Sequence, residues 1–167
     1  MNAPFYVAGA IALVSTLLVI TRASAVHALL YLIVSLLAIA VIFFQLGAPF
    51  IAALEVIIYA GAIMVVFVFV VMLLNLGPRS VDAERAWLSP VGFVGPIVLG
   101  AILAAELLYV VSIAPRPGSA SSLVSPTAVG ASLFGPYYLG VELGSFLLLA
   151  GLVGALHLAR STEQAAR

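Results

Sequence analysis

Apolar residues form five long runs along the chain, separated by short polar or glycine- and proline-containing stretches. Runs of this length are typical of bilayer-spanning helices, which need about 20 apolar residues each, whereas barrel strands would alternate apolar and polar positions. We therefore predict an all-α integral membrane bundle of five transmembrane helices that forms a single membrane domain, 1–167. The predicted helices cover approximately 3–20, 26–46, 50–76, 91–113 and 136–159.

Two connecting features complete this outline. The stretch 114–135 is rich in Ser, Ala, Pro and Gly, and we expect it to form an irregular external loop. The first apolar run is followed by Ala23-Ser24-Ala25, which resembles a signal-peptide cleavage site. However, no basic side chain precedes the run and Arg22 lies after it, so we interpret the run as a retained helix.

Charge and composition exclude several classes of protein. The chain is 65% hydrophobic and only 7% charged, against about 25% charged in ordinary soluble domains. Its net charge is zero, so no basic surface indicates nucleic-acid binding. It contains no cysteine, which excludes disulfides, thiolate metal sites and a cysteine nucleophile.

The arginines predict the orientation of the chain. With five spans the two termini lie on opposite sides of the membrane, and the arginines divide unequally between these sides. One side holds Arg22, Arg79, Arg85, Arg160 and Arg167, and the other holds Arg116. Because cytoplasmic loops carry the excess of positive charge, we expect a periplasmic N-terminus and a cytoplasmic C-terminus.

The third apolar run carries the candidate functional residues. Glu55 is the only charged residue in it, and a carboxylate inside a bilayer costs about 2.5 to 3.5 kcal/mol, so a function is expected for it. Tyr59 follows one α-helical turn later, so its phenol could donate a hydrogen bond to Glu55.

Small residues in the middle of this run mark a point where the helix can deform. Gly61 lies between Ala60 and Ala62. One extra residue accommodated as a π-bulge near 59–65 would rotate everything after it by roughly 100° about the axis. The alternative is that the small residues only let a neighbouring helix pack closely, and the sequence leaves both interpretations open.

Two further acids lie at a similar predicted depth. Glu55, Glu106 and Glu142 fall about 8 to 10 Å below the outer ends of their helices at 1.5 Å per residue. Both Glu106 and Glu142 could instead reach interfacial water. His27 and His157 lie at predicted cytoplasmic helix ends, and we set aside a bis-histidine haem because such ligands usually lie inside the span.

Three segments resemble one family of membrane proteins. The third run, LEVIIYAGAIMVVFVFVVMLLNLG, is similar to the third helix of the J-subunit family of bacterial NADH:quinone oxidoreductase, respiratory complex I. The segments AVHALLYLIVSLLAI and VELGSFLLLAGLVGALHLAR also resemble that family, a counterpart of a mitochondrial membrane-arm subunit.

This resemblance implies a function. It implies a translocase subunit of the inner membrane that couples quinone reduction to proton pumping through a π-bulge to α-helix switch and water-path gate. Residues that match the gate and proton path are Glu55, Tyr59, Gly61, Met64, Val65 and Phe67, with Glu106 and Glu142 as weaker matches.

The resemblance also implies cofactors and partners. The chain itself would hold no cofactor and perform no catalytic chemistry, while FMN, iron–sulfur clusters and quinone belong to partner subunits. Its neighbours would be the small K subunit, the quinone-site H subunit, the A subunit, the antiporter-like subunits and the lipid bilayer. Two other functions stay open: a small proton-coupled transporter that uses Glu55, and a passive assembly scaffold.

Overall fold

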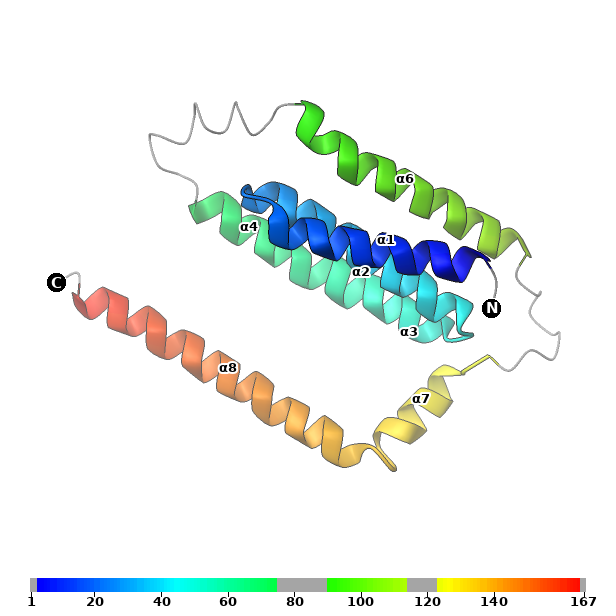
Figure 1. Ribbon diagram of the computed structural model, residues 1–167. Coiled ribbons are helices and arrows are strands. Elements are labelled where there is room, and N and C mark those ends of the chain that lie inside the picture. Colours follow the sequence, from blue (N-terminus) through cyan, green and yellow to red (C-terminus); the bar gives the residue numbers. More distant parts are fainter. Residues whose placement is uncertain (1–2, 75–89, 114–122, 166–167) are drawn as a thin grey trace. The chain divides into compact units, whose positions relative to one another are not determined.

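The computed structural model describes residues 3–74, 90–113 and 123–165, and in these ranges the chain is helical apart from short turns (Figure 1). Its helical elements are α1 (Ala3–Thr21), α2 (Ala25–Gln45), α3 (Pro49–Leu54), η1 (Glu55–Ile63), α4 (Met64–Leu74), α6 (Pro90–Ile113), α7 (Pro126–Leu133) and α8 (Tyr138–Ala165).

Five stretches of helix are long and apolar enough to cross a membrane. They are Ala3–Thr21, Ala25–Gln45, Pro49–Leu73, Gly92–Ile113 and Tyr138–Leu158. The prediction of an all-α protein with five spans is confirmed. The predicted orientation stays a prediction. It depends on the positions of the arginines, and most of them lie outside the described residues.

The chain divides into two compact units, Met1–Val124 and Ser125–Arg167. The first unit holds α1 to α6, and the second holds α7 and α8. Whether both belong to one membrane domain, as the sequence suggests, stays a prediction. The site described below lies in the first unit.

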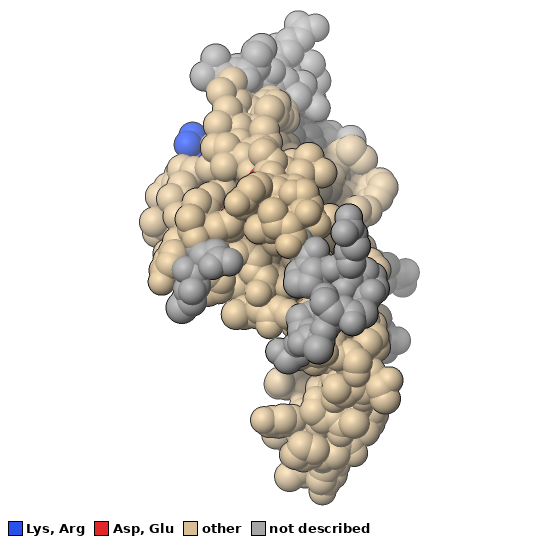
Figure 2. Space-filling model, turned by 90° about the vertical axis from the view of Figure 1, so that its right-hand side faces the viewer, with Lys and Arg blue, Asp and Glu red and all other residues tan. Residues whose placement is uncertain are grey.

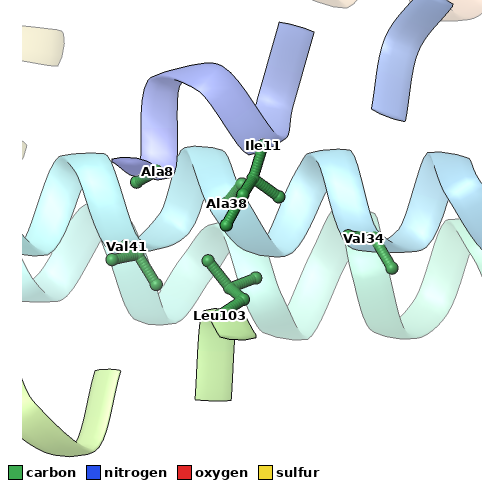
Figure 3. Close-up of a cluster of buried hydrophobic side chains, with 6 residues drawn as sticks. All are labelled: Ala8, Ile11, Val34, Ala38, Val41 and Leu103. Atoms are coloured by element: carbon green, nitrogen blue, oxygen red, sulfur yellow. The ribbon is translucent and has the colours of Figure 1, made fainter. Parts of the chain in front are cut away.

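Helix α2 is the central element of the first unit, since α1, α3, η1, α4 and α6 all contact it. A buried apolar cluster joins it to α1 and α6 (Figure 3). Its members are Ala8, Ile11, Val34, Ala38, Val41 and Leu103. Because lipid tails are as apolar as these side chains, close packing and hydrogen bonds hold such helices together.

Hydrogen bonds fix the pairing of α1 with α2. The Thr16 and Ser35 hydroxyls lie 2.8 Å apart, and both donate to the Ala12 carbonyl, at 2.8 Å and 3.2 Å respectively. In an apolar medium a single interhelical hydrogen bond contributes about 0.6 kcal/mol on average.

Two glycines allow α6 to pack tightly against α2. The His27 ring fills the space where Gly92 would carry a Cβ, and the Tyr31 hydroxyl does the same at Gly95. Phe93 packs edge-on against the His27 ring, with the ring centroids 5.3 Å apart. His27 is thus buried in a helix contact, so its surroundings indicate packing.

The expectation of an irregular external loop is wrong over part of its length. Pro126–Leu133 forms α7, and the described residues start again at 123, so 114–122 lie outside them. The local reason is a favourable helix start: the Ser125 hydroxyl accepts the Ala128 N–H at 3.1 Å, and Pro126 occupies the first turn.

Candidate functional site: the π-helical third span

The third span, Pro49–Leu73, is one helix whose middle is wound differently from its ends. At its start the Glu55 N–H donates to the Ile51 and Ala52 carbonyls, as in an α-helix. Residues Glu55–Ile63 then form a nine-residue π-helix, and the Met64 N–H donates to the Tyr59 carbonyl five residues back, and also to that of Gly61. The predicted π-bulge in the third helix is confirmed, although it begins nearer the N-terminus than the 59–65 expected.

Gly61 has a specific role in this winding. A Cβ built on Gly61 would lie 3.1 Å from the Val56 carbonyl oxygen, the backbone acceptor five residues earlier. This approach is tighter than ordinary van der Waals contact, so a side chain here crowds the wide turn. In an α-helix residue 61 pairs with residue 57 instead. Glycine therefore relieves a contact that belongs to the π-helical form.

The side chains of this span differ sharply in burial. Met64 is 2% exposed and is the most buried side chain of the span, whereas no residue of η1 is buried. Tyr59, Val65 and Phe67 are each exposed over about half their surface. Of the predicted gate residues in this span, Met64 is buried, and Glu55 and Gly61 are half-buried. The others, Tyr59, Val65 and Phe67, lie on faces open to lipid or to other chains.

The expected hydrogen bond from Tyr59 to Glu55 is absent from the described part of the chain. The two side chains differ in their surroundings, since Tyr59 is exposed over half its surface and Glu55 is half-buried. Glu55 is half-buried at the start of η1, so it stands at the boundary between the two kinds of helix.

Glu106 lies on α6 and is only 9% exposed. Its Oε1 accepts a long hydrogen bond of 3.5 Å from the Gln45 amide at the end of α2, and its buried Oε2 has no partner in the described part of the chain. Glu142 lies on α8 in the other unit, where its backbone carbonyl accepts the Ser145 hydroxyl at 2.7 Å. The first unit thus holds two of the three predicted acids.

An apolar groove next to the π-helix escaped the sequence analysis. It has a volume of about 390 Å³, with α2 as its floor and α3, the first turn of η1 and α6 as its walls. Small residues form part of its lining: Ala52 and Ala53 on α3, and Gly100 and Ala104, four residues apart, on α6. The spacing of Gly100 and Ala104 can be seen in the sequence, but it does not show which helices face each other across a groove.

Other chemistry finds no support in the described ranges. No group of three or more His, Asp or Glu side chains lies close enough there to hold a metal ion. His27 and His157 belong to different units. On the face drawn in Figure 2, the described residues show almost no charged side chains, as expected for a protein surrounded by lipid and other apolar helices.

These features define a class of protein: a multi-pass α-helical membrane protein with a π-helical segment inside one span. The chain also matches the NADH-ubiquinone/plastoquinone oxidoreductase chain 6 family over residues 15–158. This chain belongs to that family, and the resemblance noted in the sequence is confirmed.

Individual relatives agree along nearly the whole chain. The NADH-quinone oxidoreductase subunit J of Pseudomonas aeruginosa is 58% identical over 161 residues, or 96% of this chain and 97% of the relative. That of Escherichia coli (strain K12) is 54% identical over 160 residues, or 96% and 87% of the two chains. That of Buchnera aphidicola subsp. Schizaphis graminum is 48% identical over 163 residues, or 98% and 100%. The chain is therefore a membrane-arm subunit of a multi-subunit NADH-quinone oxidoreductase, and it fits a multi-pass protein of the bacterial inner membrane.

Proposed function

We propose that this subunit couples quinone reduction to proton transfer by changing the winding of its third span. In one state the span contains the π-helix Glu55–Ile63, and in the other it is α-helical throughout. The change opens or closes a path for water and protons beside the span. The observation that carries the proposal is a nine-residue π-helix in the middle of a membrane span, since π-helical turns are rare and frequently occur at functional sites.

A change of winding would rotate the side chains that follow the π-helix. Loss of one inserted residue from the winding turns the rest of the helix by about 100°. On α4 this turn moves Val65 and Phe67, which are bulky and exposed, to a different side of the span. Side chains of this size decide whether water can pass through a narrow apolar constriction. Gly61 lies inside the segment whose backbone pairing changes between the two states.

The remaining candidate residues have ionisable side chains. Glu55, at the start of the π-helix, is the acid nearest the moving segment, and Tyr59 lies inside it. Ionisable side chains inside membrane spans commonly mark proton relays. Glu106 and Glu142 are the further acids of the proposed path.

In this proposal the subunit does no redox chemistry. FMN, iron–sulfur clusters and quinone are held by other subunits, and its neighbours are the K, H and A subunits and the antiporter-like subunits. The names of its relatives, each one subunit of an NADH-quinone oxidoreductase, support an assembly of several subunits.

Substitutions in the third span separate a switch from a passive scaffold. Gly61→Leu crowds the π-helical turn, and Val65→Leu enlarges an exposed side chain just after it. We expect at least one of these variants to assemble at the normal amount and yet show reduced quinone reductase and proton-pumping rates. If activity falls only in proportion to the amount of assembled complex, for these and other substitutions in the span, the subunit is a scaffold.

A further inference from the structure

The side chains that face α2 on either side of η1 fix the register of the third span. Ala52, before the π-helix, is buried. After it, Met64 is buried and Val71 is half-buried, whereas 65–70, 72 and 73 are all exposed. Met64 and Val71 are seven residues apart, which is two helical turns, so they lie on one face.

Helical arithmetic shows that this arrangement requires the π-helix. In a continuous α-helix of about 100° per residue, the twelve residues from Ala52 to Met64 would leave these side chains about 120° apart. One inserted residue reduces that separation to about 20°, which agrees with the burial of both. Without the insertion, the residue about 20° from Ala52 is Ile63, and Val70 follows it one heptad later.

We propose that a single packing site on α2 holds Met64 in the π-helical state and Ile63 in the α-helical state, and that these two residues set the balance between the states. Val71 and Val70 exchange in the same way. This inference rests on the proposed function, and it adds which half of the span turns and which side chains compete. Ile63 and Val70 are exposed in the π-helical structure, so neither loses a packing position within this chain when it enters the site.

The N-terminal half of the span is the fixed half. A tight turn holds it to α2: the Leu46, Gly47 and Ala48 N–H groups donate to the carbonyls of residues 42, 44 and 43. Gly47 has a φ of 79°, which favours glycine, and its carbonyl accepts the Val124 N–H at 2.8 Å. A rotation of α3 would break this turn and expose Ala52. Rotation of α4 exchanges one apolar side chain for another.

The competition predicts opposite effects of two truncations. Met64→Ala leaves a cavity at the site only in the π-helical state, so it shifts the ratio of the states toward the α-helix, by about tenfold or more. Ile63→Ala leaves the cavity only in the α-helical state, so it shifts the ratio toward the π-helix. The double variant returns the ratio toward that of the natural chain.

The test is electron cryomicroscopy of the complete NADH-quinone oxidoreductase during turnover, with particles sorted by the winding of the third span. The samples are the natural complex, Met64→Ala, Ile63→Ala and the double variant. The matched control is Ile57→Ala, because Ile57 is an exposed residue of η1 and would lie about 140° from Ala52 around a continuous α-helix. If the Met64→Ala complex fails to assemble, Met64→Leu is used instead, because it conserves the side-chain volume. The structure of this variant shows directly which side chain occupies the site on α2.

We expect α-helical particles with Ile63 against α2, opposite shifts for the two truncations and no shift for Ile57→Ala. The exchange is refuted if α-helical particles keep Met64 against α2, or if both truncations shift the ratio in one direction. Neither result would refute the proposed change of winding in the third span. If every sample contains only the π-helical span, the proposed function fails together with the exchange.

Discussion

Substitution of Gly61 by alanine is the smallest change that separates the two states of the third span. The added Cβ meets the Val56 carbonyl oxygen at 3.1 Å in the π-helix, so that backbone must move by a few tenths of an ångström. A misfit of this size lies at the lower end of overpacking costs, about 1 kcal/mol. The higher helix propensity of alanine does not offset it, because both states are helical.

About 1 kcal/mol changes an equilibrium about fivefold, so Gly61→Ala should reduce the π-helical population by that factor. The assay is the quinone reductase and proton-pumping rate per assembled complex in membrane vesicles, with the assembled amount measured separately. We expect normal assembly and a rate reduced by up to the same factor. Gly9→Ala is the control, because no atom lies within 4 Å of its added Cβ. Equal rates for the two variants, with an unchanged π-helical fraction, would refute the reasoning.

Three further predictions concern the rest of the first unit. Glu55→Gln should lower the turnover of the assembled complex by about twofold or less, because the amide keeps the shape and hydrogen-bonding capacity of the side chain without its charge. A normally assembled but inactive complex would show that the charge is essential. Gly92→Ala forces a Cβ into the His27 ring and should reduce the stability of the complex by about 1 to 3 kcal/mol, measured by thermal melting. Adding His27→Ala removes the ring and should restore the melting midpoint. Thr16→Ala removes the bond to Ser35 but leaves the bond from Ser35 to the Ala12 carbonyl, so it should cost only about 0.6 kcal/mol. Adding Ser35→Ala removes that second interhelical bond and should lower the melting midpoint further.

The five spans could be predicted from local sequence, whereas the π-bulge was predicted from local sequence together with the family resemblance, because the small residues alone left close packing as an alternative. Long apolar runs give the five spans, and the small residues on both sides of Gly61 indicate where a helix can widen. The short helix α7 was missed although its Ser125 cap and Pro126 are also local signals, since a composition rich in Ser, Pro and Gly suggested a loop.

Tertiary relationships could not be predicted in the same way. The hydrogen bond from Tyr59 to Glu55 was expected from their spacing, but spacing along a helix does not determine the rotamers of two side chains. The packing of His27 against Gly92 depends on which faces of α2 and α6 meet. Almost every residue in these spans is apolar, so hydrophobic periodicity does not distinguish a face that meets another helix from one that meets lipid.

The surface of the third span has a consequence for biogenesis. Only 6% of its most apolar window is buried within the chain. A newly inserted copy therefore exposes to the bilayer a helix that the rest of the described chain covers very little. Such a copy should be a substrate for membrane proteases until neighbouring subunits cover it, so the cellular level of this chain should follow the rate at which its partners are synthesised.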